Sequence, residues 1–236
     1  MATAPSQRTR VRRVPARGAY DRETIDAILD AGLVAHLGFA VDGQPFVIPT
    51  LHARIGDTVY VHGSAASRAI RTLSAGMPAC LTVTLLDGLV LARSAFHHSM
   101  NYRSVVVLGD ARAVTDPTEL LTLMEAFTNR LVPGRWDEVR KPNRKELKGT
   151  RALAMNLDEA SAKVRTGPPV DDDEDYELDV WAGVIPLGVT AGEPSADPRL
   201  REGIEPSSVV TTWRPSAPRA PHHRSSAVPR RSRPDR

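Results

Sequence analysis

The sequence is poor in several features, and each shortage excludes a class of protein. Cys80 is the single cysteine among 236 residues, so an intramolecular disulfide is excluded. It lies in an apolar run, and we interpret it as a small buried side chain rather than a reactive thiol. No apolar run is long enough to cross a bilayer, and no charged-then-apolar leader opens the chain. We therefore expect a cytoplasmic protein without a membrane partner.

Signatures of common nucleotide and hydrolase sites are also lacking. The chain has no Gly-x-Gly-x-x-Gly after a strand, no Walker loop and no Gly-x-Ser-x-Gly elbow. These absences argue against a Rossmann-type NAD site.

No metal site is predicted either. His97 and His98 are adjacent, so on an extended segment they would point in opposite directions and form a poor ligand pair. The acidic run at 171–175 lacks the alternating ligands and the glycine bend of a calcium loop. We interpret that run as a solvated loop.

The net charge of +3 is small, and the basic excess lies in the two ends of the chain. The arginines concerned are Arg8, Arg10, Arg12, Arg13 and Arg17 at the start, and Arg214, Arg219, Arg224, Arg230, Arg231, Arg233 and Arg236 at the end. Beyond Gly192 the chain loses apolar periodicity and becomes rich in Pro, Arg and Ser, which is typical of disorder.

Three segments follow from this composition: a basic flexible N-terminus at 1–13, a folded domain at 14–191 and a disordered tail at 192–236. Removal of the tail is expected to leave the fold intact, because the tail has no apolar period with which to dock. Its arginines could contact nucleic-acid phosphates, but aromatic residues apart from Trp213 are not interleaved with them, so nucleic-acid binding is not favoured.

Strand patterns dominate the first half of the folded domain. A helix is predicted over 21–31, with Asp21 as its cap and Gly32 as its stop. Strands are predicted at 33–41, 44–55, 58–62, 79–86, 89–94 and 102–114, with a short helix at 67–75. Hairpin turns are expected at 42–43, 56–57 and 87–88. Near-continuous antiparallel strands with flanking helices predict a mainly β, α+β protein built on a barrel.

The second half adds helices to this barrel. Asp116, Pro117 and Glu119 predict a helix start in which Glu119 reaches back to the cap. Leu120, Met124, Phe127 and Leu131 would form its buried face. A further helix is predicted at 143–148, and segments 152–157 and 162–165 would close the barrel.

A cluster at 62–68, with sequence HGSAASR, places two serines and an arginine where a strand ends and a helix begins. Amides at a helix start, together with the fixed cation Arg68 and the hydroxyls of Ser64 and Ser67, would suit a phosphate group. The alternative is that the serines merely cap the helix and Arg68 is solvated.

Four segments in this order resemble the flavin-nucleotide-binding proteins of the pyridoxamine 5'-phosphate oxidase-like superfamily, in the branch that includes nitroimidazole reductases. They are PTLH at 49–52, HGSAASR at 62–68, RSAFHHSMNYRS at 93–104 and WAGVIP at 181–186, and the resemblance spans 14–187. It implies an antiparallel split β-barrel that binds FMN at the interface of a homodimer.

The resemblance also assigns roles to residues. The family's Ser-Arg-Lys run, which holds the FMN phosphate, corresponds here to Ser67 and Arg68, while Ala69 replaces the lysine. Ser64, Arg71 or an arginine of the partner chain could replace the missing contact. Ile48, Pro49 and Thr50 match the strand beside the flavin ring, although an ordinary edge strand would also carry such a proline.

Further cofactor contacts are expected from the 93–104 run and from His62. Arg93 and Ser94 could lie near the flavin, with Arg93 tuning its redox chemistry, or Arg93 could face the exterior. Tyr102 and Ser104, or else Asn101 and Arg103, would face the cofactor, because strand alternation does not select between the two sets. His62 is the candidate catalytic residue, with a structural histidine as the alternative.

The function predicted from these features is that of an FMN-dependent oxidoreductase acting on a small organic molecule, with nitro-group reduction as one activity and NAD(P)H as a transient reductant. The alternative is a flavin carrier or redox sensor without turnover. The sequence identifies no substrate. A deazaflavin or haem in place of FMN is an open alternative.

Overall fold

The computed structural model describes residues 2–215, so tail arginines such as Arg219 and Arg236 lie outside the described residues. The strands are β1 (Gly18–Ala19), β2 (Val34–Val41), β3 (Gln44–Ile55), β4 (Thr58–Ser64), β5 (Ala75–Leu91), β6 (Ser99–Ala113), β7 (Thr150–Asn156), β8 (Ala160–Arg165) and β9 (Gly183–Pro186). The α-helices are α1 (Arg22–Ala31), α2 (Arg68–Leu73), α3 (Pro117–Leu131), α4 (Arg135–Glu138), α5 (Arg144–Gly149) and α6 (Ser208–Thr211), and 3-10 turns lie at Pro15–Arg17, Ala95–His97 and Asp173–Glu177.

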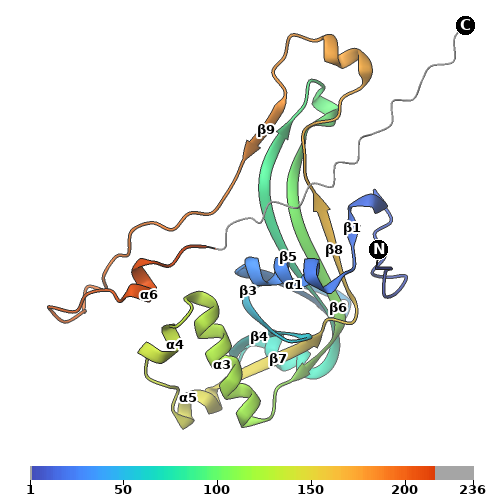
Figure 1. Ribbon diagram of the computed structural model, residues 1–236. Coiled ribbons are helices and arrows are strands. Elements are labelled where there is room, and N and C mark those ends of the chain that lie inside the picture. Colours follow the sequence, from blue (N-terminus) through green and yellow to red (C-terminus); the bar gives the residue numbers. More distant parts are fainter. Residues whose placement is uncertain (1, 216–236) are drawn as a thin grey trace, which may run out of the picture.

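Six strands form a closed ring. The sheet order is β1-β8-β6-β7-β4-β3-β2-β5-β9, and the additional pairing of β5 with β6 joins the two sides of the ring. All pairings between these strands are antiparallel. The predicted fold class, an antiparallel split barrel with flanking helices, is therefore confirmed (Figure 1).

The two longest strands extend well beyond the ring. We use the name arm for residues 86–103, which are the outer ends of β5 and β6 with the connection between them, together with β9 (Figure 1). The chain reverses at the far end of the arm through the 3-10 turn Ala95–His97, and β9 lies along the outer edge of β5.

The short hairpins follow their turn residues closely. Asp42 and Gly43 adopt φ values of 50° and 78°, as a two-residue turn between antiparallel strands requires, and Gly56 at 57° turns β3 into β4. The predictions for these two turns are confirmed.

The predicted hairpin turn at Asp87 and Gly88 is wrong. β5 runs through both residues, with a register shift between Leu86 and Gly88 that leaves Asp87 as a bulge. Its carboxylate accepts two hydrogen bonds from Arg103, at 2.9 and 2.7 Å. A Cβ on Gly88 would lie 3.0 Å from the Ile185 carbonyl oxygen, so the glycine permits close approach of β9 rather than a turn.

The helices begin where the capping residues predict. The Asp21 side chain accepts from the Thr24 amide and Asp116 accepts from the Thr118 amide. Glu119 does not reach back to its cap; it instead accepts from the Tyr60 hydroxyl at 3.1 Å and from Arg112. The α3 face that is buried carries Leu123 and Phe127, whereas Leu131 is exposed.

Two apolar clusters hold the fold together. The larger fills the ring and includes Leu37, Val61, Leu81 and Val107, and α1 and α2 pack against it. The smaller lies between α3 and the outer side of β3, β4 and β7, and includes Leu123 and Phe127. No helix among residues 2–215 is long and apolar enough to span a membrane.

The segment that follows β9 runs back along the molecule toward α4 (Figure 1). Its only α-helix up to residue 215 is α6, and the Ser207 hydroxyl at the start of α6 donates to Glu138 at 2.9 Å. The domain boundary at 192 stays a prediction.

Candidate functional site

β3 offers an unpaired backbone edge beside the predicted phosphate loop. Residues 44–51 pair with β2 on one side, while on the other side β4 pairs only with 52–55. Within the described chain, the edge that carries Ile48, Pro49 and Thr50 therefore has no strand partner. Backbone amides and carbonyls on such an edge need other hydrogen-bonding groups, and Pro49 is tolerated there because it has no amide hydrogen to satisfy.

The junction of β4 and α2 brings the predicted phosphate contacts together. The Ser67 amide donates to the Ser64 carbonyl at 2.9 Å, and the Ser64 hydroxyl accepts from the Ala66 amide at 3.2 Å. The Ser67 side chain makes no capping hydrogen bond. A Cβ on Gly63 would lie 3.2 Å from Cγ1 of Ile70, so glycine at this position lets α2 pack tightly on β4.

Arg68 joins this junction to β3. Its guanidinium carbon lies 4.6 Å from the centre of the Phe46 ring, so the two elements contact each other through a cation–π pair. Among residues 2–215 no carboxylate forms an ion pair with Arg68. Its charge is therefore available to an anion.

His62 lies on the opposite face of β4 from Gly63. Its ring packs against Phe127 of α3 with the ring centres 4.2 Å apart, and its Nδ1 is buried without a hydrogen-bond partner among the described residues. Burial lowers the pKa of His62 and favours the neutral ring. The contact with α3 matches the structural alternative, and the catalytic role stays a prediction.

Arg93 and Ser94 lie on the arm, where they bind Asp171. The Asp171 carboxylate accepts from both backbone amides and from the Arg93 guanidinium at 3.2 Å. Burial alone would raise the pKa of Asp171, but these hydrogen bonds outweigh it and lower the pKa. Arg93 also stacks on Tyr176 at 4.8 Å. The interpretation of 171–175 as a solvated loop is therefore wrong for Asp171, which anchors the loop to the arm.

The β6 candidates have different surroundings. Asn101 is buried; its amide nitrogen donates to the Gly167 carbonyl at 3.1 Å and its amide oxygen accepts from Arg165. The Ser104 hydroxyl donates to the Lys163 carbonyl at 3.3 Å, and Tyr102 lies opposite Arg165 in the pairing of β6 with β8. Apart from His62, which packs against α3, the predicted contacts thus form two groups, one at the β3–α2 junction and one on or next to the arm.

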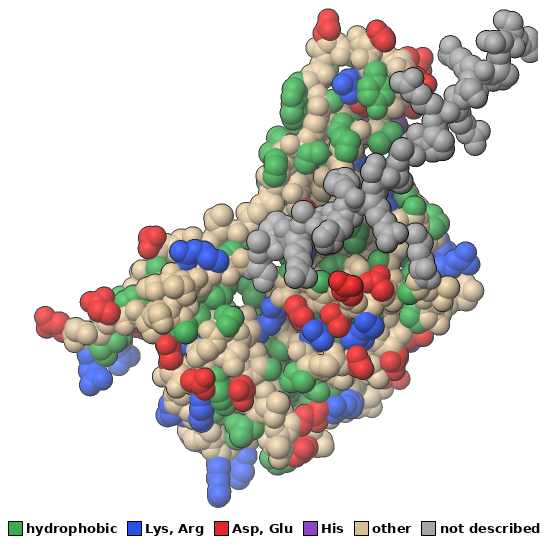
Figure 2. Space-filling view, viewed as in Figure 1, with side chains coloured by type: hydrophobic (Ala, Val, Ile, Leu, Met, Phe, Trp, Pro, Cys, Tyr) green, Lys and Arg blue, Asp and Glu red, His purple; other side chains and the backbone are tan. Residues whose placement is uncertain are grey.

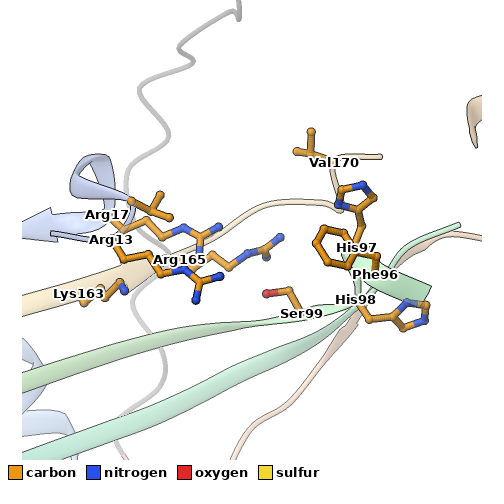
Figure 3. A pocket seen from close by; sticks show the side chains of 10 residues that line it. Arg13, Arg17, Phe96, His97, His98, Ser99, Lys163, Arg165 and Val170 are labelled. Carbon is orange, nitrogen blue, oxygen red and sulfur yellow. The ribbon is translucent and has the colours of Figure 1, made fainter. Parts of the chain in front are cut away.

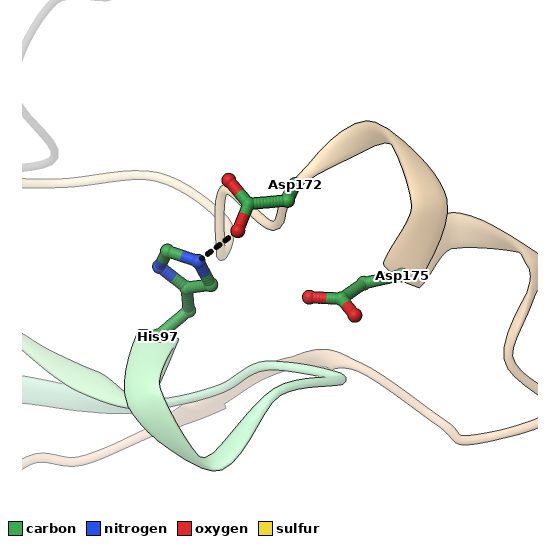
Figure 4. A group of neighbouring side chains, drawn as sticks. All are labelled: His97, Asp172 and Asp175. Atoms are coloured by element: carbon green, nitrogen blue, oxygen red, sulfur yellow. Dashed lines mark hydrogen bonds and ion pairs between the residues drawn. The ribbon is translucent and has the colours of Figure 1, made fainter.

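His97, Asp172 and Asp175 approach one another at the end of the arm, with their ligand atoms within 4.8 Å (Figure 4). The His97 Nε2 lies 3.3 Å from an Asp172 oxygen, and the Asp172 side chain is largely exposed. This hydrogen bond orients the imidazole and ties the acidic loop to the arm.

A basic pocket beside the arm is not part of the site that the sequence predicts. It has a volume of about 470 Å³ and is lined by Arg13, Arg17, Lys163 and Arg165 on one wall (Figure 3). The pairing of β1 with β8, in register at Gly18 and Lys163, places Arg17 beside Lys163. These residues are separated by about two thirds of the chain, so local sequence patterns carry no signal for the pocket.

Comparison with known proteins identifies the family. The sequence profile described as pyridoxamine 5'-phosphate oxidase matches residues 21–164. The chain belongs to this family. The match begins at the Asp21 cap of α1 and ends in β8, so it covers the whole ring of six strands. No curated protein matches the chain.

Solved structures extend the family comparison beyond the ring. The flavocytochrome Anf3 from Azotobacter vinelandii is 44% identical, with a TM-score of 0.84, and the match covers 89% of this chain and 97% of that one. An FAD- and haem-binding protein from Mycobacterium smegmatis is 37% identical, with a TM-score of 0.80 and coverage of 84% and 98%.

A protein of Bacteroides thetaiotaomicron, described as a putative 5-nitroimidazole antibiotic resistance protein, is 19% identical, with a TM-score of 0.53 and coverage of 62% and 86%. At that identity the likeness shows the shared fold alone.

Proposed function

We propose that the protein is a redox protein that binds a flavin nucleotide together with haem and acts as a homodimer. The observation that carries the proposal is the β3–α2 junction, where an unpaired strand edge lies beside an arginine that has no carboxylate partner among the described residues. Family membership and the names of the two similar structures support it.

The junction fits both chemically distinct parts of a flavin nucleotide, the ring and the phosphate. The free amides and carbonyls of β3 near Ile48 and Thr50 match the donors and acceptors on the pyrimidine edge of an isoalloxazine ring. Arg68 and the Ser67 hydroxyl match a phosphate, because a guanidinium can donate to two phosphate oxygens at once. When bound, the ring supplies hydride and electron transfer, while the protein holds and orients it.

FMN is the flavin that the sequence predicts, but the comparisons favour FAD. The Mycobacterium smegmatis protein is described as binding FAD and haem, and it shares 37% of its residues with this chain. We therefore propose FAD as the resident flavin. Its second phosphate requires a further donor, and the exposed Arg71, one helical turn after Arg68, is suitably placed on α2.

Haem requires an axial ligand, and imidazole is a common one. The described chain exposes His36 on β2 and His98 on the arm. His98 Nδ1 lies 3.0 Å from the Ser94 carbonyl oxygen, which makes Nδ1 the protonated nitrogen and leaves the Nε2 lone pair for a metal. When bound, haem supplies one-electron transfer.

Exposed apolar side chains support a homodimer. On the arm, Leu89, Met100 and Ile185 lie directly opposite one another across β6, β5 and β9, and all three are exposed. Val47 is 67% exposed on β3. Figure 2 shows hydrophobic side chains gathered along the arm. Contiguous exposed apolar surface of this kind is typical of a protein interface.

Repeated reduction and reoxidation of the flavin distinguishes an oxidoreductase from a flavin carrier or sensor. The test is anaerobic mixing of the purified protein with NADPH or NADH, followed by oxygen or a nitroaromatic acceptor, while flavin and haem absorbance are recorded. An oxidoreductase is reduced rapidly and reoxidised over repeated cycles. If neither NADPH nor NADH reduces the flavin on the time scale of turnover, the result would instead support a carrier.

A further inference from the structure

The basic pocket beside the arm concentrates positive charge without visible compensation. Arg13, Arg17, Lys163 and Arg165 converge on it from the N-terminal segment and from β8 (Figure 3). No aspartate or glutamate lines the pocket, and none of the four cations forms an ion pair within residues 2–215. Four like charges in one hollow repel one another, so an anion there would be strongly favoured.

Arg165 is the least solvated of the four, with an exposed fraction of 7%. Asn101 accepts one of its hydrogen bonds, the contacts with the Gly167 and Pro168 carbonyls are long at 3.4 Å, and its Nε has no partner among the described residues. Burial and then the charge of Arg17 lower the pKa of Arg165. A buried guanidinium whose donors are incompletely satisfied is costly unless a ligand completes its hydrogen bonds.

The opposite wall of the pocket suits a flat ring. Phe96 is 88% exposed at the end of the arm, and its ring lies edge-on to His97 with the centres 5.3 Å apart. Ser99 lies between these rings and the cations (Figure 3). The hollow therefore combines an aromatic wall with a cationic wall.

We propose that this pocket binds two adjacent oxyanions carried by a flat aromatic ligand. The paired propionates of haem have that chemistry, whereas the FAD phosphates are assigned to Arg68 and Arg71. The choice of haem rests on the proposed function, whereas the anion site itself rests on the uncompensated cations. The site is separate from Arg68, which lies at the β3–α2 junction in the barrel.

Arg13→Gln/Arg17→Gln is the test variant, because Arg13 is exposed and Arg17 is only half-buried, so neither supports the core. Arg10→Gln/Arg12→Gln is the matched control, since it removes the same charge from the same exposed segment but from residues that do not line the pocket. FAD and haem are quantified per chain in each purified protein, and inorganic pyrophosphate is titrated against thermal stability at constant ionic strength.

We expect the test variant to bind its ligand roughly tenfold or more weakly, because charge-assisted contacts are lost, while the control matches the unmodified protein. Selective loss of haem supports the propionates as the ligand, whereas selective loss of FAD with haem retained contradicts that assignment. Stabilisation by pyrophosphate that only the test variant lacks supports the site even if the protein carries neither cofactor, in which case the proposed function fails alone. Equal cofactor contents and equal pyrophosphate responses in the two variants overturn the site.

Discussion

Arg68 is the residue on which the proposed recognition of the flavin phosphate depends most. Its charge has no carboxylate partner in the described chain, and Phe46 holds the guanidinium beside the open edge of β3. We predict that Arg68→Ala weakens binding of FMN or FAD by roughly tenfold to a hundredfold, since it removes a charge-assisted contact of about 1.5–3 kcal/mol.

Riboflavin is the control ligand because it lacks the phosphate. Its affinity, measured by fluorescence quenching alongside FMN and FAD, is expected to change little in the Arg68→Ala protein. If riboflavin loses as much affinity as FMN and FAD, the damage is general and Arg68 does not recognise the phosphate.

His52 links stability to pH. It is fully buried, its Nε2 donates to the Leu29 carbonyl at 2.9 Å, and its Nδ1 has no partner among the described residues. Burial lowers its pKa, and the Arg130 charge adds to that effect, whereas the hydrogen bond to Leu29 and the nearby Asp30 oppose it. The folded protein therefore favours the neutral ring.

Above its ordinary pKa of about 6.5, His52 is neutral in both the folded and the unfolded chain, so stability is fully present there. Below that pH the unfolded chain gains a proton that the folded chain excludes, so stability falls by up to about 1.4 kcal/mol per pH unit for this group. His52→Gln is expected to flatten the pH dependence of the unfolding midpoint, measured in denaturant. Parallel curves for the two proteins would contradict this role.

Single residues also show where sequence patterns reach their limit. Ser67 and Arg68 are predictable because strand, serine and helix start are contiguous in the chain. The partner of Asn101 is not, because Arg165 lies 64 residues further on and is brought to it by the pairing of β6 with β8. The Arg93–Asp171 contact likewise joins residues that lie 78 positions apart, so no local pattern predicts it.

At the scale of elements, the junction of α1 and β5 depends on Gly32. A Cβ at this position would lie 2.3 Å from Cγ1 of Val83, a side chain that is itself fully buried. We predict that Gly32→Ala destabilises the fold by about 1–3 kcal/mol through overpacking. Gly109→Ala is the control and should be near neutral in chemical denaturation, because no atom of the described residues lies within 4 Å of the added Cβ. Equal stability of the two variants would show that α1 can move away from β5.

Elements with strong local signals are predictable in type and position. The helix caps Asp21 and Asp116 and the turn at Asp42 and Gly43 each fix an element through neighbours within a few residues. The through-running β5 is not predictable, because Asp87 and Gly88 carry the same local signal as a turn. Only the contacts of Asp87 with Arg103 and of Gly88 with β9 determine the bulge.

For the molecule as a whole, the proposed dimer would place apolar surface of β3 and the arm out of water. Val47→Glu introduces a charge at a side chain that is already 67% exposed, so the folded single chain should tolerate it. We predict a shift from dimer to single chain in analytical ultracentrifugation, with loss of bound flavin. Leu121→Glu, at an exposed position on α3, is the control and should stay dimeric. A Val47→Glu dimer with full flavin content would remove β3 from the interface.

Native mass spectrometry of the freshly purified protein tests the central claim most directly, because one spectrum reports both the assembly and its cofactors. We predict a complex of two chains that carries noncovalent flavin and haem, with the flavin mass distinguishing FAD from FMN. A spectrum that shows only single chains would contradict the account. A spectrum in which neither single chains nor dimers carry a flavin would also contradict it.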